Sequence, residues 1–384
     1  MRFEFATATH IVFGEGKLAE VAPAAAATGR RALLVTGRSV DRAAPLARAL
    51  EAAALLAAPF PVSGEPTIEL IRSGAEYART ERCDLVIAMG GGSAIDAGKA
   101  LAALLTNPGE PLDYLEVVGR GQPLERPSAP FIAIPTTAGT GSEVTRNAVL
   151  AAPERRVKAS LRSAHMLPRL AVVDPQLAFD LPRAVTASTG LDALTQLIEP
   201  YVSSRSNPMT DLFCIEGMRY AAEALPLAYD NGCDRAARSA MSWAALLGGL
   251  ALANAGLGAV HGFAAPVGGM FAAPHGAICA AVLPHAMEIN VEALRRRAPA
   301  SPSLKRYDEV ARLLTGSPQA GAGDGVQWVA ALCRRLQIPP LATYGLTEAD
   351  IPELVTRAAQ ASSMKANPIA LTPDELREIV ARAI

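Results

Sequence analysis

Two histidines and an aspartate carry the side chains best suited to bind a metal ion. His261 and His275 bound the segment HGFAAPVGGMFAAPH, and Asp192 lies upstream in DALTQLIEP. The chain contains only 5 histidines, so two of them in one segment rich in Gly and Pro stand out. Imidazole nitrogen and carboxylate oxygen are ligands of divalent ions such as Zn²⁺ and Fe²⁺. These three side chains are therefore predicted to hold one ion and to be the catalytic residues.

Three more side chains lie near the predicted ligands in the sequence. Gln196 follows Asp192 by one helical turn and would share its face, but its amide oxygen is a weak, neutral ligand, so direct metal binding is left open. Cys279 has the same spacing from His275, and a buried, unreactive thiol is the favoured interpretation there. Glu199 is interpreted as a helix-surface residue or a local hydrogen-bond partner.

A glycine-rich loop after an apolar stretch is typical of a dinucleotide site. Residues 85–89 (LVIAM) run into Gly91, Gly92 and Ser93, and a helix-forming stretch follows. Backbone N–H groups and the positive end of the helix dipole can bind a pyrophosphate there, with a tight structural turn as the alternative. Asp96, expected in the first turn of this helix, either complements the dipole or contacts the cofactor.

A second loop, PTTAGTGSE, follows the apolar residues 131–134. Short hydroxyl side chains suit a phosphate or a nicotinamide amide, which need donors at close range. Both loops would lie at the carboxyl edge of a parallel sheet, where α/β proteins bind ligands. The small hydroxyl residues of this loop are Thr136, Thr137, Thr140 and Ser142, and the family resemblance described below implies that they line the cofactor.

The two halves of the chain predict different folds. Four continuously apolar stretches (32–36, 85–89, 131–134 and 170–173), with helices at 43–54 and 67–79, indicate an α/β domain with a buried parallel sheet over residues 1–180. Residues 181–384 predict an all-α domain for the metal and substrate, which begins at the turn 181–185. Its helices are expected at 187–202, 208–228, 235–255, 276–291, 305–314 and 325–336, with two more near the C-terminus and the loosest stretch at 297–318.

Composition narrows the class of protein. The chain has 384 residues and a net charge of −1, which favours two domains and argues against a nucleic-acid partner. Its 5 scattered cysteines and its N-terminus, which lacks the pattern of a signal peptide, favour a cytoplasmic protein. Residues 243–260 are apolar enough to raise the question of a membrane span, but a buried helix is preferred, so no membrane partner is expected.

Four segments in order, GGGSAID, IPTTAGTGSEVT, DALTQLIEP and HGFAAPVGGMFAAPHG, resemble the iron-containing, or group III, alcohol dehydrogenase family. The resemblance implies a dehydroquinate synthase-like architecture, NAD or NADP, and a divalent metal, Fe or Zn. It also implies hydride transfer between small alcohols and aldehydes or ketones, and a homodimer. Lys158 would contact the cofactor, and Asp192, His261 and His275 fall on three of the family's four metal-ligand positions.

Three residues depart from the family pattern. Gln196 replaces the fourth ligand, a histidine, so the metal would be held less tightly. Ala265 stands where many members have a further histidine. Gly37, followed by Arg38, replaces an aspartate that favours NAD, so these two residues would contact the cofactor and NADP is slightly favoured.

Other functions remain open at this stage. Gln196 and Ala265 motivate a metal-independent reductase resembling the maleylacetate reductases. The weakened ligand set also motivates a dinucleotide-binding protein without turnover. A carbon–oxygen lyase like dehydroquinate synthase is less favoured, since few basic residues accompany the two histidines.

Overall fold

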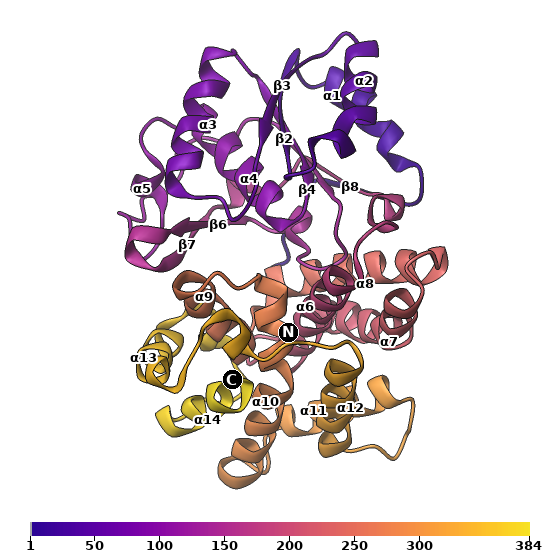
Figure 1. Ribbon diagram of the computed structural model, residues 1–384, viewed down its shortest axis with the longest axis vertical. Helices are drawn as coiled ribbons and strands as arrows, with labels where there is room; N and C mark the ends of the chain where they lie inside the picture. Colours follow the sequence, from indigo (N-terminus) through magenta and orange to yellow (C-terminus); the bar gives the residue numbers. More distant parts are fainter. Residues whose placement is uncertain (1) are drawn as a thin grey trace. The chain divides into compact units, whose positions relative to one another are not determined.

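The computed structural model describes residues 2–384, which form two compact units (Figure 1). One unit comprises Ala6–Thr137 and Gly141–Ala178 and contains the strands. The other comprises Phe179–Ile384, Ala138–Thr140 and the described N-terminal residues through Phe5, and its regular structure is helical. The predicted fold class, an α/β half followed by an all-α half, is confirmed.

A six-stranded, fully parallel sheet is the centre of the first unit (Figure 1). Its four inner strands are the four that the sequence predicts, and the two edge strands were not predicted. The edge strand β3 contains Pro59 and Pro61, which are compatible with an edge position, and exposes most of its residues. In order across the sheet the strands are β1 (His10–Phe13), β8 (Leu170–Val173), β5 (Phe131–Pro135), β4 (Leu85–Gly90), β2 (Arg31–Thr36) and β3 (Leu56–Pro61).

Helices cover both faces of this sheet, and each face has its own apolar core. Alternate residues of one strand point to opposite faces, so Leu33 and Val35 enter one core while Ala32 and Leu34 enter the other. This two-sided burial explains why the inner strands are continuously apolar. The α-helices of the unit are α1 (Val21–Ala26) and α2 (Ala44–Ala52) on one face, α3 (Ile68–Thr80) and α4 (Gly92–Thr106) on the other, and the short α5 (Pro111–Tyr114).

An antiparallel hairpin, β6 (Asn147–Ala152) and β7 (Val157–Arg162), follows β5 and packs through β6 on α4. The sequence analysis missed both strands, and β7 alone contains charged residues, Lys158 and Arg162, that interrupt its apolar pattern. The remaining short elements of this unit are 3₁₀ turns: η1 (Lys17–Glu20), η2 (Val40–Ala43), η3 (Ser142–Val144), η4 (Pro153–Arg155), η5 (Ala164–Met166) and η6 (Pro175–Ala178).

The fully buried Lys99 of α4 joins the helix to the loop after β5 and to the hairpin. Its ammonium donates hydrogen bonds to Ser142 Oγ and Thr145 Oγ1, both at 2.7 Å, and to the backbone oxygen of Asn147 at 2.9 Å. Burial lowers the pKa of Lys99 to about 8, although the nearby Asp96 carboxylate opposes that shift. This cation therefore fixes the position of a loop predicted to bind the cofactor.

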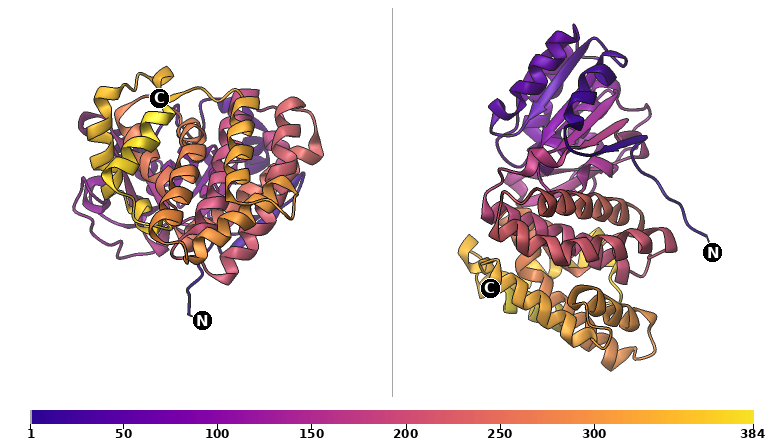
Figure 2. Two further views of the ribbon diagram at one scale, coloured as in Figure 1. Left: turned by 90° about the horizontal axis from the view of Figure 1, so that it is seen from below. Right: turned by 90° about the vertical axis from the view of Figure 1, so that its right-hand side faces the viewer.

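The second unit is built around α6 (Arg183–Val202), which packs against α7 (Pro208–Asp230), α8 (Arg235–Ala255) and α10 (His275–Arg297) (Figures 1 and 2). The segment between the histidines contains a helix that the sequence analysis did not include, α9 (Ala259–Met270), despite its Gly and Pro. The helix predicted at 305–314 is present as α11 (Pro302–Thr315), so much of the stretch 297–318, predicted to be the loosest, is helical. The remaining elements are α12 (Ala322–Arg335), η7 (Leu341–Tyr344), η8 (Glu348–Asp350), α13 (Ile351–Gln360), η9 (Ser362–Ala366) and α14 (Pro373–Ala383).

Two helices of this unit, α8 and α10, are long and apolar enough to cross a membrane by length and composition alone. Within the apolar window of each, 67% and 83% of the residues are buried against the rest of the structure. The stretch 243–260 is not one continuous helix, because α8 ends before Gly256, which has a φ of 74°, and α9 begins at Ala259. Both helices therefore pack as core helices do.

We expect Lys99→Met to lower the free energy of unfolding by about 3 kcal/mol, because it leaves Asp96 buried without its cation and removes three hydrogen bonds. Urea unfolding of the purified variant measures this loss. The control is Lys17→Met, which removes a solvent-exposed partner of Glu20 and should change the free energy by no more than ~0.5 kcal/mol. Equal stability of the two variants would contradict the role given to Lys99.

Candidate active site

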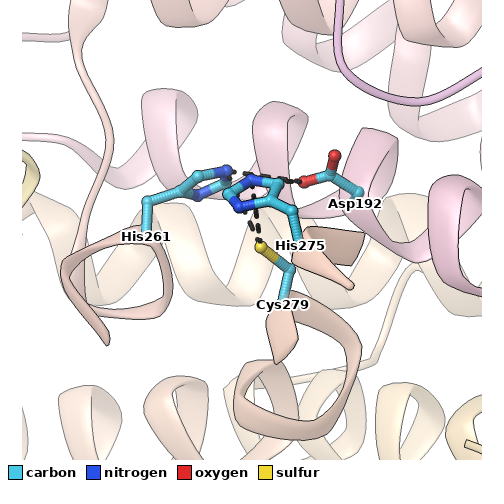
Figure 3. Close-up of side chains that lie close together, drawn as sticks. All are labelled: Asp192, His261, His275 and Cys279. Atoms are coloured by element: carbon cyan, nitrogen blue, oxygen red, sulfur yellow. Dashed lines mark hydrogen bonds and ion pairs between the residues drawn. The ribbon is translucent and has the colours of Figure 1, made fainter. Parts of the chain in front are cut away.

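The three predicted metal-binding side chains converge in the helical unit, and Cys279 joins them (Figure 3). Asp192 comes from α6, His261 from α9, and His275 and Cys279 from α10; one ligand atom of each lies within 4.8 Å of the others. Asp192 Oδ1 is 3.5 Å from His261 Nε2 and 3.7 Å from His275 Nε2. Residues far apart in the sequence thus present their donor atoms to one point.

Hydrogen bonds at the first turn of α9 fix the position of His261. The backbone N–H groups of Ala259 and Val260 donate to Asn367 Oδ1 at 3.0 Å and to Glu199 Oε1 at 2.7 Å. Both are N-terminal helix donors, which have no partner within their own helix. A Cβ atom at Gly258 would lie 2.9 Å from each of these two oxygens, so glycine is required there.

Glu199 is a site residue that the sequence analysis misjudged. It is buried, and its Oε2 lies 2.7 Å from His261 Nδ1. When Nδ1 carries the proton and donates it to Glu199, Nε2 is left with a lone pair directed toward Asp192. Glu199 follows Asp192 by seven residues, two helical turns, and this spacing could have placed it on the same face of α6.

The buried oxygens of this cluster lack hydrogen-bond partners. Both carboxylate oxygens of Asp192 and the amide oxygen of Gln196 are buried without one among the described residues. Burial acts to raise the pKa of Asp192, but His275, His261 and the Gln196 amide together lower it below its usual range. A buried, ionised carboxylate without hydrogen bonds is costly unless a cation compensates it. The donor set therefore fits a divalent metal ion.

Cys279 is buried, as predicted, but its thiol is directed into this cluster. Its Sγ lies 3.6 Å from His275 Nε2 and 3.9 Å from His261 Nε2. Burial acts to lower the pKa of His275, but the nearby Cys279 and Asp192 raise it to about 9. The sequence left open that Cys279 faces the site and favoured a buried, unreactive thiol; the structure shows a buried thiol that faces the cluster.

The predicted cofactor residues gather at the carboxyl edge of the sheet in the other unit. Thr36 pairs with Met89 and Gly90 pairs with Pro135, so the loops after β2, β4 and β5 leave the sheet at the same level. Strand order reverses between β2 and β4, the point where α/β sheets bind ligands. The structure therefore brings together the loops that contain Gly37, Gly91 and Thr136.

The loop after β4 has the expected form of a phosphate-binding turn. Gly91 precedes the first turn of α4, where Gly92 and Ser93 lie, and no side chain caps this helix end. A Cβ atom at Gly90 would lie 2.6 Å from Ala94 Cβ, so the close approach of strand and helix needs glycine there. The N-terminal N–H groups of α4 remain suited to an anion.

Three of the predicted cofactor residues, Asp96, Ser142 and Lys158, have contacts that the sequence did not indicate. Asp96 lies beyond the first turn of α4, and its carboxylate accepts hydrogen bonds from Ser142 Oγ at 2.6 Å and from the Val149 N–H at 3.0 Å. The prediction that Asp96 lies in the first turn was therefore wrong. Lys158 Nζ lies 3.0 Å from Glu65 Oε1. Thr140 groups with the helical unit, whereas Thr136, Thr137 and Ser142 group with the sheet unit.

Comparison with known proteins identifies the family. The family description "Iron-containing alcohol dehydrogenase" matches residues 8–175, and "Fe-containing alcohol dehydrogenase family, C-terminal" matches residues 186–384. The chain therefore belongs to the iron-containing alcohol dehydrogenase family. This finding confirms the resemblance drawn from the sequence, and with it an oxidoreductase family that uses a nicotinamide dinucleotide and a divalent metal.

Individual relatives agree over nearly the whole chain. Alcohol dehydrogenase 4 of Schizosaccharomyces pombe is 35% identical over 97% of this chain and 87% of its own length. The NAD-dependent methanol dehydrogenase of Bacillus methanolicus is 34% identical over 97% of both proteins. The crystal structure of a 1,3-propanediol oxidoreductase superposes with a TM-score of 0.92 at 31% identity and covers 100% of both chains. These similarities favour an alcohol dehydrogenase over the alternatives left open by the sequence.

We expect Glu199→Gln to weaken metal binding about 10- to 100-fold, because the amide no longer offers His261 Nδ1 a charged acceptor. Competition with a chromophoric zinc chelator measures the affinity. The matched control is Glu309→Gln, which alters a carboxylate that accepts a hydrogen bond from Tyr201 at 2.6 Å in the same unit. Unchanged zinc affinity in Glu199→Gln would refute the positioning role.

Proposed function

We propose that this chain is an NAD(P)-dependent, metal-assisted alcohol dehydrogenase that interconverts small alcohols and aldehydes or ketones. The observation that carries the proposal is the buried Asp192 carboxylate, which has no hydrogen-bond partner among residues 2–384 and faces two imidazoles in a chain of this family. The names of relatives, which include methanol and 1,3-propanediol dehydrogenases, support a small hydroxylated substrate.

Asp192, His261 and His275 are the proposed metal ligands and catalytic residues. A divalent cation bound there would polarise the substrate oxygen and stabilise the alkoxide. The role of the protein side chains is to hold that cation in a fixed place, and Glu199 keeps the proton of His261 on Nδ1 so that Nε2 can bind. Gln196, buried with its amide oxygen unpartnered, is proposed as an additional neutral donor.

The sheet edge of the other unit is the proposed cofactor site. Gly91, Gly92 and Ser93 would bind the pyrophosphate through backbone N–H groups, since they form the first turn of α4. A nicotinamide bound there would supply the hydride chemistry, so the reaction needs no nucleophilic side chain. Asp96 and Lys99 hold Ser142, and through it the loop that would line the cofactor. The remaining residues assigned to this site are Gly37, Arg38, Thr136, Thr137, Thr140, Ser142 and Lys158.

The same proposal assigns a role to each domain and extends to the location and assembly of the protein. Residues 1–180 would act as the dinucleotide-binding domain and residues 181–384 as the metal and substrate domain. We also propose a cytoplasmic homodimer, as the family resemblance implies, with no nucleic-acid or membrane partner. The net charge of −1 and the core packing of α8 and α10 support the last two points.

The activity test uses purified protein loaded with Zn²⁺ or Fe²⁺, short-chain alcohols and diols, and either NAD⁺ or NADP⁺. We expect alcohol-dependent reduction of the nicotinamide, its loss after chelation, and its return on adding the metal. His261→Ala should not recover, because one ligand is gone. Turnover that survives complete metal removal would instead favour the metal-independent reductase, and no turnover with any substrate would refute the dehydrogenase.

Cofactor preference depends on Gly37, whose Cβ position is open, with no atom within 4 Å. An aspartate there fits without strain and would pair with the ribose hydroxyls of NAD while repelling a 2′-phosphate. We expect Gly37→Asp to shift the ratio of kcat/KM values toward NAD by about tenfold, equivalent to ~1.4 kcal/mol. Gly323→Asp, an equally open position in α12, is the control for the added charge. An unchanged ratio would contradict the assignment.

A further inference from the structure

We propose that the thiolate of Cys279 is a ligand of the metal ion, so that the protein holds it through one carboxylate, two imidazoles and one sulfur. The inference rests on the metal site proposed above and assigns it a donor that the family pattern does not include. In that pattern the fourth protein ligand is a histidine at the position of Gln196. In this chain the proposed fourth ligand is Cys279 of α10 instead.

Four of the six separations among the donor atoms are close to those around a tetrahedral ion, and the other two are within 4.8 Å (Figure 3). Bonds of ~2.0 Å to nitrogen or oxygen and ~2.3 Å to sulfur place neighbouring ligand atoms ~3.3 Å apart, or ~3.6 Å where one is sulfur. The carboxylate oxygen of Asp192 lies 3.5 and 3.7 Å from the two Nε2 atoms, and Cys279 Sγ lies 3.9 and 3.6 Å from them. Each separation exceeds the ideal value by at most ~0.4 Å.

The donor atoms of the cluster face one another. When the side chain of His261 donates its Nδ1 proton to Glu199, its Nε2 presents a lone pair to the cluster. Both oxygens of Asp192 lack a hydrogen-bond partner among the described residues, and a neutral Cys279 would bring a single weak S–H donor. With the imidazoles neutral, these facing donor atoms suit a cation bound among them.

Two other buried cysteines show what a thiol outside such a cluster looks like. Cys333 donates a hydrogen bond to the backbone oxygen of Ala280 at 3.5 Å, and burial raises its pKa to about 12. Cys214 is fully buried, and burial raises its pKa well above the usual value. Cys279 alone among these three lies beside two imidazoles and a carboxylate.

Charge balance also favours sulfur at this position. A divalent ion with Asp192, two neutral imidazoles and a neutral amide leaves one positive charge in a buried site, which is costly. Replacing the amide by a thiolate makes the assembly neutral. Binding breaks the S–H bond of Cys279, forms a metal–sulfur bond with the electron pair of sulfur, and releases the proton to solvent, with no change in oxidation state. A thiolate ligand also favours Zn²⁺ over Fe²⁺, because sulfur is a softer donor than oxygen or nitrogen.

The test is the absorption spectrum of the protein loaded with Co²⁺, a spectroscopic substitute for zinc. Thiolate bound to Co²⁺ gives an intense near-ultraviolet charge-transfer band that nitrogen and oxygen ligands do not give. We expect the band in the unmodified protein and in Cys333→Ser, and its loss in Cys279→Ser. Zinc affinity of Cys279→Ser, measured by chelator competition, should fall by more than ~100-fold, because loss of a direct ligand should exceed the loss of about 10- to 100-fold expected for an outer contact.

The outcomes separate this inference from the metal site itself. Stoichiometric Co²⁺ binding without the band, or a band that persists in Cys279→Ser, overturns sulfur ligation and leaves the proposed dehydrogenase intact. Failure of the unmodified protein to bind any Co²⁺ or Zn²⁺ overturns both. Circular dichroism of Cys279→Ser and Cys279→Ala confirms that the variants are folded, so that loss of the band reports the ligand.

Discussion

The burial of the Asp192 carboxylate without a hydrogen bond is the constraint on which the helical unit depends. Placing an ionised group in the core costs several kcal/mol unless opposite charge or hydrogen bonds are supplied. No hydrogen bond reaches it among the described residues. Three other helix positions are arranged around it instead: His261 at the start of α9, and His275 and Cys279 in the first turns of α10. The packing of α6 against α10 thus buries apolar side chains and also brings Asp192 close to His275 and Cys279.

Residues outside the cluster of donor side chains fix the positions of its members. Glu199 and Asn367 each satisfy a backbone donor at the start of α9, and Glu199 also fixes the ring of His261. Asn367 is itself held by Asn290 of α10 through a hydrogen bond of 2.7 Å. The sheet unit uses the same device at Lys99, whose three hydrogen bonds set the loop after β5. In both units, buried polar networks position flexible segments more firmly than apolar contact alone would.

The sequence predicts strands that are buried on both faces and residues with a recognisable local pattern. It does not predict features that depend on tertiary contacts. The inner strands were predicted because both of their faces are covered, whereas the edge strand β3, with Pro59, reads like a loop. The ligands were predicted from residue type and order. Asp96 lies one residue beyond the first turn in which it was predicted, because α4 begins at Gly92 and helix starts are poorly determined by sequence. Glu199 and Cys279 were misjudged because burial beside a histidine is decided by how α6, α9 and α10 pack.

The departures from the family pattern are better understood together than singly. Gln196 removes an imidazole from the expected ligand set, and Ala265 removes another from the helix that carries His261. Taken alone, these changes predict a weaker site. The structure adds the thiol of Cys279 at 3.6 Å from His275 Nε2. As a thiolate it would supply a negative charge that the neutral Gln196 amide does not. The proposed site lacks the neutral imidazole that the family has at position 196 and gains the anionic, softer thiolate of Cys279. This exchange changes both the total charge of the site and the metal that it prefers, so it is more than a loss of affinity.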